Sequence, residues 1–186
     1  MANIDLKGFT EDFYRMQCGG SLQEVLDACE EARRQGTHVE LTCLLIPGLN
    51  DSPPEVERLA CWIVERMGEE TPLFLYRFRP FYRSAHIPQQ TMERMEEAYG
   101  IGIEAGLKHV YFGGTVGESH QDTLCPSCGL VVVRRRSLQV ADKVCFKNGE
   151  VSRFCPTFAD IAVDLDGDLC PRCGGRIAIV PLDAPL

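Results

Sequence analysis

Apolar, β-branched runs alternate with amphipathic stretches over the first two thirds of the chain. Each run ends at a glycine or proline turn, which is typical of strands. These runs predict strands at 4–6, 39–46, 73–78 and 109–112. Between them, apolar residues spaced three and four apart predict helices. The predicted helices begin at the capping residues Ser21, Ser52 and Thr91.

Two of these helix starts carry a capping-box pattern, because Glu24 and Glu55 each lie three residues after the serine. The strand starts recur about every 35 residues. Such repeated strand–helix units favour right-handed crossovers and a parallel sheet. In the third helix, four apolar residues are predicted to face the core: Met92, Met95, Tyr99 and Ile103.

The second strand indicates which kind of parallel sheet to expect. Its apolar face is uniform, whereas the other face carries Glu40 and Thr42. A strand buried by helices on both sides should not carry a mid-strand glutamate, but a strand facing a polar barrel lumen can. Glu40 and Thr42 are therefore predicted either to touch a cofactor or substrate or only to hydrate a polar channel.

Four strands cannot close a parallel barrel, which usually needs about eight. The pattern thus predicts the C-terminal half of a partial (β/α) TIM-like barrel, with the edge of its first strand exposed. We expect the chain to be a C-terminal fragment of a longer protein. Self-association through the unclosed barrel edge is the alternative.

Charge divides the chain at nearly the same place as its cysteines. Residues 1–120 hold 11 basic and 19 acidic residues, and residues 121–186 hold 8 of each, within a total net charge of −8. The acidic balance disfavours a nucleic-acid partner. No apolar run is long enough for a membrane helix and no signal peptide is recognisable, which predicts a cytoplasmic protein without a membrane partner. Two domains are predicted, 1–120 and 121–186.

Ten cysteines in a reducing compartment suggest metal binding before disulfides. Four of them form two matched units, CPSCG at 125–129 and CPRCG at 170–174. Two such units predict a tetrahedral four-thiolate site in a small zinc-ribbon or rubredoxin-like β domain. The predicted ligands are Cys125, Cys128, Cys170 and Cys173. Four thiolates suit both zinc and iron. Zinc is placed first because structural zinc ribbons are commoner, and rubredoxin-type iron second.

The 41 residues between the two units contain short apolar runs that predict strands at 131–133, 144–146 and 161–165. Cys145 and Cys155 lie in this insertion and either replace one ligand or are bystanders; their lack of CxxC spacing favours bystanders. The other cysteines lie in the first domain. Cys29, Cys43 and Cys61 fall on apolar faces and are predicted to be buried and structural.

Four further segments follow one another along the chain: NIDLKGF at 3–9, LIPGLNDS at 45–52, RFRPFY at 77–82 and AGLKHVY at 105–111. Together they resemble one family, the radical SAM activating enzymes related to the pyruvate formate-lyase activator. Their order is similar to that of AmmeMemoRadiSam-system radical SAM enzymes. The match covers residues 3 to about 129 and the second CPxCG unit.

The resemblance implies a partial barrel that binds S-adenosylmethionine and a [4Fe–4S] cluster and generates a 5′-deoxyadenosyl radical. It implies that Lys7 contacts the S-adenosylmethionine carboxylate and that Asp5 lies beside the cofactor or on a monovalent cation. Arg77 and Arg79 would recognise a carboxylate or phosphate, or belong to a solvated loop. Arg79 stands where the family more often has histidine.

The chain departs from the family at its central motif, because no CxxxCxxC occurs in it. The chain alone is therefore expected to be inactive, and the cluster and S-adenosylmethionine chemistry to need the full-length protein. The substrate is open and could be a protein. The alternative function is a non-catalytic zinc-ribbon module for protein interaction.

Overall fold

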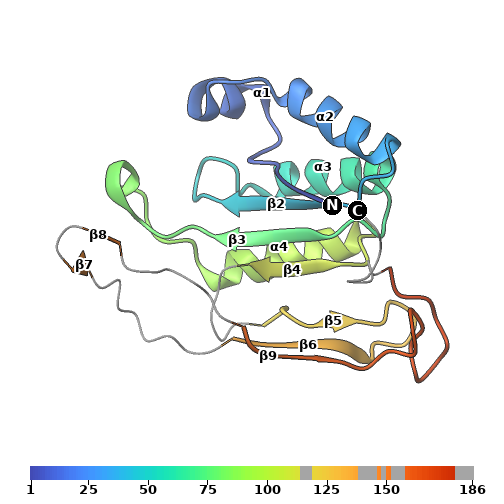
Figure 1. Cartoon of the computed structure of the whole chain (residues 1–186). Helices are drawn as coiled ribbons and strands as arrows, with labels where there is room; N and C mark the ends of the chain where they lie inside the picture. Colours follow the sequence, from blue (N-terminus) through green and yellow to red (C-terminus); the bar gives the residue numbers. More distant parts are fainter. Residues whose placement is uncertain (114–118, 138–145, 148–149, 152–157, 179–186) are drawn as a thin grey trace. The chain divides into compact units, whose positions relative to one another are not determined.

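The computed structural model describes residues 1–113, 119–137, 146–147, 150–151 and 158–178 (Figure 1). The chain divides into two compact units, one containing Met1–Gly113 and the other Gly114–Ile177. We describe each unit by itself. The boundary predicted after residue 120 stays a prediction. No helix in the described part of the chain is long and apolar enough to cross a membrane.

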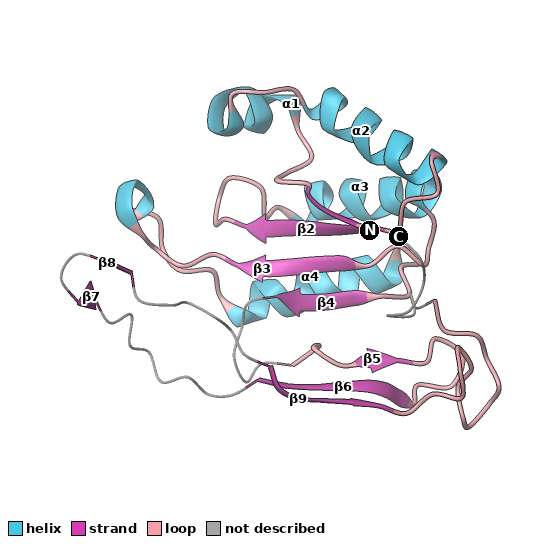
Figure 2. Cartoon of the chain, in the orientation of Figure 1, coloured by secondary structure: helices cyan, strands magenta, loops and turns pink. Residues whose placement is uncertain are grey.

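The first unit is a four-stranded sheet with helices between its strands (Figure 2). The strand order is β1-β2-β3-β4, and every neighbouring pair is parallel. This confirms the predicted parallel α/β arrangement. The strands are β1 Ala2–Asp5, β2 Val39–Leu45, β3 Leu73–Arg77 and β4 Val110–Gly113. The helices are α1 Glu11–Phe13, η1 Tyr14–Cys18, α2 Leu22–Arg34, α3 Pro53–Trp62, η2 Ile63–Met67, η3 Tyr82–Ser84 and α4 Met92–Glu104.

The two faces of the sheet differ as the alternation in β2 predicts. One face packs against the helices, and its β2 residues Val39, Leu41, Cys43 and Leu45 are each at most 6% exposed. The opposite face carries a row of in-register residues that changes from polar to aromatic. The row runs Asp5, Thr42, Phe74 and Tyr111.

Helix α4 follows the predicted inward stripe except at its last position. Met95 is fully buried, and Met92 and Tyr99 pack against the core. Ile103, also predicted to face inward, is 42% exposed. The inward position of the last turn is taken by Gly102, which is buried, so Ile103, one residue later, lies on the exposed side of the helix.

Helix α2 begins at Ser21 as predicted, but the capping box is not formed. The Ser21 side chain caps no backbone N–H; the carboxylate of Glu11 accepts from the N–H groups of Leu22 (3.2 Å) and Gln23 (3.0 Å) instead. These donors lower the pKa of Glu11. The cap thus comes from the helical segment 11–18, which the sequence pattern did not predict.

The capping box predicted for α3 is also wrong. The Ser52 side chain makes no cap bond, and Glu55, only 6% exposed, accepts from the backbone N–H of Phe9 at 2.8 Å. Glu55 therefore ties the loop after β1 to α3. The cap predicted for α4 is confirmed, because the Thr91 hydroxyl accepts from the N–H of Arg94 at 3.2 Å.

The second unit contains a three-stranded antiparallel sheet in the order β5-β6-β9. The strands predicted near 131–133 and 161–165 correspond to β6 and β9; of 144–146, only residue 146 is described, in β7. The predicted zinc-ribbon class of this unit stays a prediction. Its strands are β5 Thr123–Leu124, β6 Val131–Ser137, β7 Phe146–Lys147, β8 Glu150–Val151 and β9 Phe158–Val163.

Candidate functional site

The carboxyl ends of β1 and β2 bring three predicted site residues together. Asp5 and Thr42 lie opposite each other in the parallel register, and the Thr42 hydroxyl donates to Asp5 Oδ1. The ammonium of Lys7 donates to the other carboxylate oxygen, with Nζ and Oδ2 2.6 Å apart. One carboxylate therefore holds a hydroxyl on one side and an ammonium on the other.

This group combines a buried hydroxyl with two accessible charges. The hydrogen bonds from Lys7 and then Thr42 lower the pKa of Asp5, so its carboxylate is ionised at neutral pH. Thr42 is 6% exposed, whereas the side chains of Asp5 and Lys7 are 59% and 47% exposed. The carboxyl ends of β1 and β2 thus present one anionic and one cationic group. Parallel barrels place their active sites at this end of their strands.

The main chain of Lys7 is fixed from both sides. Its N–H donates to the hydroxyl of Tyr14 at 3.0 Å, and its carbonyl accepts from Asn50 Nδ2 at 2.6 Å. Tyr14 and Asn50 are 3% and 2% exposed. Burial raises the pKa of Tyr14 to about 12, so the hydroxyl keeps its proton. Lys7 therefore extends from a backbone that two buried side chains hold in place.

Asn50 uses every polar atom of its side-chain amide. Besides the Lys7 carbonyl, Nδ2 donates to the carbonyl of Leu44 at 2.8 Å, and Oδ1 accepts from the N–H of Ile46 at 2.7 Å. In the sequence, Asn50 is distinguished only as part of the segment LIPGLNDS at 45–52. The missed role depends on the approach of β1 to β2, since Lys7 lies 43 positions away in the chain.

The remaining predicted residues lie apart from this group. Arg77 ends β3 in register with Leu45, and its Nε donates to the carbonyl of Gln90 at 2.7 Å. Arg79 is exposed and forms no ion pair or hydrogen bond within the described residues. Glu40 lies nearer the amino end of β2, where it accepts from Asn3 Nδ2 at 3.3 Å. The role of Arg77 and Arg79 in cofactor binding stays a prediction.

The face of the sheet beside the polar group is aromatic. The rings of Phe74 and Tyr111 stack with centroids 5.0 Å apart. Two residues further along the strands, Tyr76 lies opposite Gly113, and a Cβ on that glycine would overlap the tyrosine ring. Glycine is therefore required at 113 for the ring to lie against the strand. On this face Tyr111 is buried, Phe74 is half-buried and Tyr76 is 37% exposed, so Tyr76 is its most accessible ring.

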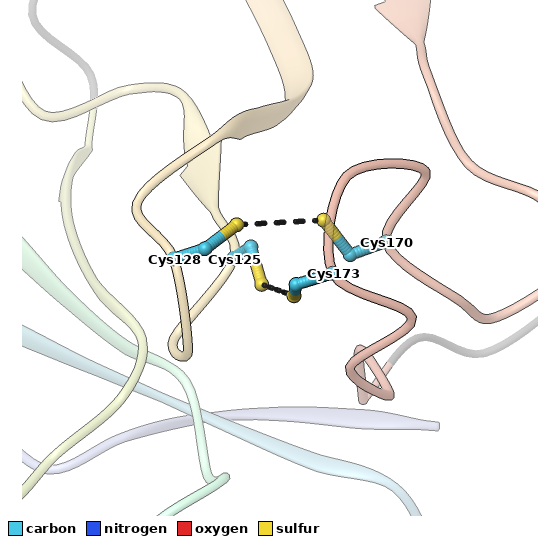
Figure 3. A group of neighbouring side chains, drawn as sticks. All are labelled: Cys125, Cys128, Cys170 and Cys173. Carbon is cyan, nitrogen blue, oxygen red and sulfur yellow. Dashed lines mark hydrogen bonds between the residues drawn. The ribbon is translucent and has the colours of Figure 1, made fainter.

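The second unit brings the four predicted metal ligands together (Figure 3). All four Sγ atoms lie within 4.8 Å of one another. Cys125 and Cys173 have their sulfurs 3.6 Å apart, and Cys128 and Cys170 have theirs 3.7 Å apart. Metal–sulfur bonds of about 2.3 Å in a tetrahedron require sulfurs about 3.8 Å apart, whereas a disulfide needs about 2.05 Å. The four cysteines fit a metal ion and could bind one.

The two CPxCG turns have the same backbone geometry. Gly129 N–H donates to the Cys125 carbonyl at 2.9 Å, and Gly174 N–H donates to the Cys170 carbonyl at 2.8 Å. The glycines have φ of +70° and +69°, which an L side chain rarely adopts. Each turn thus presents two sulfurs on one side of a tight loop, and the two loops face each other.

The electrostatics of the cluster favour a bound cation. Burial raises the pKa of Cys125, but the backbone N–H groups of Cys128 and Ser127 outweigh it, so this pKa falls to about 7. For Cys173, the N–H of Gly175 lowers the pKa, but the sulfurs of Cys128 and Cys125 raise it to about 12. Four sulfurs this close cannot all ionise unless a cation lies among them.

The cysteines of the first unit agree with their predicted structural role only in part. Cys29 and Cys43 are buried, and burial raises their pKa values to about 11 and about 12, which makes both thiols inert. Cys61 is half-buried, and Cys18 is exposed. Cys145 and Cys155 lie outside the described residues, so the choice between ligand and bystander stays a prediction.

No protein-family model matches the chain. Over 178 residues it is 33% identical to an uncharacterized protein, MJ0808, of Methanocaldococcus jannaschii. That alignment covers 96% of this chain and 48% of the other protein, so the chain spans about half the length of this curated relative.

Two solved structures resemble the chain in fold. A domain of pyruvate-formate lyase-activating enzyme from Bacteroides vulgatus matches with a TM-score of 0.52 and 17% identity, covering 60% of this chain and 66% of that chain. A radical SAM methyltransferase from Sphaerobacter thermophilus matches with a TM-score of 0.50 and 19% identity, covering 61% of this chain and 34% of that chain. At these identities the likeness concerns the fold alone. The chain has a radical SAM-like fold.

Proposed function

We propose that this chain is the C-terminal part of a radical SAM enzyme of the activating-enzyme type, similar to the AmmeMemoRadiSam-system proteins, with a zinc-binding tail. The observation that carries the proposal is the position of the Asp5–Lys7–Thr42 group. It lies at the carboxyl ends of parallel strands in a chain with a radical SAM-like fold. The relative MJ0808, twice as long as the matched region, supports a longer polypeptide.

The residues at this edge suit the amino-acid end of S-adenosylmethionine. That end carries a carboxylate and an ammonium, and Lys7 and Asp5 supply the two opposite charges. The methionine sulfonium and adenosine need an apolar and aromatic surface, for which the exposed Tyr76 and the half-buried Phe74 are the candidates. In this proposal Lys7 binds the carboxylate, Asp5 binds the ammonium or a monovalent cation, and Thr42 orients Asp5.

The chain does not fit the [4Fe–4S] cluster of such enzymes. It has no CxxxCxxC, and the first-unit thiols Cys29 and Cys43 are buried with raised pKa values. The cluster, which would supply the electron for reductive cleavage of S-adenosylmethionine, belongs to the other part of the longer protein in this proposal. Without it, this chain binds and orients the cofactor but cleaves nothing.

The decisive test extends the chain with the sequence upstream in its own gene and purifies the product without oxygen. We expect that sequence to contain CxxxCxxC and the product to release 5′-deoxyadenosine from S-adenosylmethionine. Lys7→Ala should weaken S-adenosylmethionine binding at least about tenfold, since it removes a charge-assisted bond. Lys108→Ala is the matched control. Lys108 pairs with Glu69 and Glu70 and lies just before β4, at the amino ends of the strands and not at their carboxyl ends. Unchanged binding in Lys7→Ala would refute the assignment.

Zinc is the metal proposed for Cys125, Cys128, Cys170 and Cys173. Structural sites of four thiolates are closed and leave no position for water, which suits a stabilising rather than hydrolytic ion. Metal analysis of the purified chain should give one zinc per chain and no colour. A red protein with one iron would replace zinc by rubredoxin-type iron.

A metal-bearing interaction module without catalysis is the second candidate. The paired CPxCG turns favour it, because they form a complete ligand set within the second unit alone. It becomes the better description if the gene encodes no CxxxCxxC upstream and the chain does not bind S-adenosylmethionine.

A further inference from the structure

The loop between β3 and α4 exposes two aromatic side chains. Phe81 and Tyr82 are each 75% exposed, more than any other aromatic residue in the described part of the chain. Burying a phenylalanine or tyrosine is favourable by a few kcal/mol, so neighbouring exposed rings are a feature that binding surfaces share. The loop, residues 78–90, follows the carboxyl end of β3, and Asp5 and Lys7 lie at the carboxyl end of β1 in the same parallel sheet.

The base of this loop is held closed. Gln90 N–H donates to the carbonyl of Phe78 at 3.1 Å, and Arg77 Nε donates to the carbonyl of Gln90 at 2.7 Å. The side chain of Gln90 is 2% exposed and donates from Nε2 to Asp51 Oδ2 at 2.9 Å. The two ends of the loop are therefore held together by hydrogen bonds, so its rings are not exposed because the base of the loop has come apart.

The tip of the loop is also ordered by its own hydrogen bonds. Ser84 N–H donates to the Phe81 carbonyl at 3.0 Å, and Ile87 N–H donates to the Ser84 carbonyl at 3.1 Å. Tyr82 adopts φ +50°, a left-handed conformation that is rare for a bulky residue. Strained conformations persist where the surroundings hold them and are concentrated at ligand sites. The residue in this conformation is also one of the two exposed aromatic residues of the loop.

Charge in this region opposes the charge of the chain. From residue 71 to 92 there is no aspartate or glutamate, but there are three arginines, in a chain of net charge −8. Arg79 and Arg83 form no ion pair with the described residues, whereas Arg34 and Arg66 pair with carboxylates. The Arg83 guanidinium lies 5.4 Å from the centre of the Tyr82 ring. Two unpaired cations thus flank two exposed rings.

We infer that this loop is a docking surface for an acidic segment of a polypeptide with apolar side chains. Arginine and tyrosine are enriched at the energetic centres of protein interfaces. A nucleic acid is less suited, because its continuous negative charge needs a wide basic face, and this loop offers only Arg79 and Arg83. This binding does not rest on the proposed function.

The test is fluorescence anisotropy of the full chain with a fluorescein-labelled peptide of alternating glutamate and leucine. We expect saturable binding that weakens with added salt, and none to a lysine–leucine peptide of equal length. The double variant Arg79→Glu with Arg83→Glu should weaken binding at least about tenfold. Arg58→Glu is the matched control, since Arg58 is an exposed arginine of α3 that forms no ion pair with the described residues.

Tyr82→Gly separates a binding role from a structural one. Glycine adopts φ +50° without strain, so the urea midpoint of the first unit should not fall, while peptide binding should weaken. Equal peptide binding by the wild type and the double arginine variant would overturn the inference. Tighter binding of an oligothymidine than of the acidic peptide would also overturn it. So would a double arginine variant whose main defect is loss of self-association rather than loss of peptide binding.

The outcome is distinguishable from failure of the proposed function. Lys7→Ala should leave peptide binding unchanged while S-adenosylmethionine binding weakens. If the extended protein never releases 5′-deoxyadenosine but the arginine variants still lose the peptide, the docking surface stands and the proposed enzyme does not. If the peptide fails to bind while Lys7→Ala weakens S-adenosylmethionine binding, the reverse holds.

Discussion

Replacing Asn50 by alanine is expected to lower the free energy of unfolding of the first unit by about 3 kcal/mol. The change removes three hydrogen bonds, to the N–H of Ile46 and to the carbonyls of Lys7 and Leu44, from a side chain that is 2% exposed. An unsatisfied buried group costs about 1–3 kcal/mol. We take about 1 kcal/mol for each bond, because these backbone groups lie near loops that water can reach.

The assay is urea unfolding followed by fluorescence of Trp62. It is the single tryptophan of the chain, lies in α3 and has its ring centroid 6.0 Å from that of Phe9, so its signal reports the first unit alone. With a slope of about 1–2 kcal/mol per M, the midpoint should fall by about 2 M. Asn50→Asp should be destabilised at least as much at pH 7, because a carboxylate oxygen would replace the donor that lies 2.6 Å from the Lys7 carbonyl.

Asn3→Ala is the matched control. Asn3 is exposed and makes one long bond of 3.3 Å to Glu40, so its loss should change stability by less than about 0.5 kcal/mol. A midpoint for Asn50→Ala within the error of the wild type would refute the reasoning. It would mean that β1 and β2 keep their ends together without the amide.

Three further predictions concern the metal, the Asp5 group and the turn after β1. Chelation, or Cys125→Ser, should abolish metal binding and collapse the amide dispersion of the second unit in NMR spectra, with the Trp62 midpoint unchanged. Asp5→Asn should cost only a few tenths of a kcal/mol at pH 7, because the ion pair is exposed. Since the pKa of Asp5 is lowered from its ordinary 3.8, that contribution is present above pH 3.8 and lost as the pH falls through the folded value, where urea midpoints of variant and wild type should converge. Gly8→Ala should cost about 1–3 kcal/mol by thermal unfolding, because its Cβ would lie 2.7 Å from the buried Phe13 ring, whereas Gly20→Ala, with open space around it, should be neutral.

The fold of the first unit was largely predictable because it depends on local patterns. Period-2 and period-3.6 alternation specify strands and helices, and repeated βα units specify parallel pairing. The alternation in β2 predicted correctly which residues face the helices. The pattern failed where a distant group replaced a local one: Glu11 rather than Ser21 caps α2, and Glu55 binds Phe9 rather than its own helix start.

The same distinction between local patterns and contacts of distant residues applies to the candidate sites. The sequence alone identifies the four cysteines that the structure brings together, because CxxC spacing places two sulfurs in one turn wherever that turn lies. It also determined that the chain lacks the three-cysteine motif for a cluster. The sequence does not reveal that Asp5, Lys7 and Thr42 form one group, or that Asn50 and Tyr14 hold the Lys7 backbone; the folded chain shows both. These contacts depend on the register between β1 and β2, which are separated by two helical segments, and a register is set by packing of the whole sheet rather than by neighbouring residues.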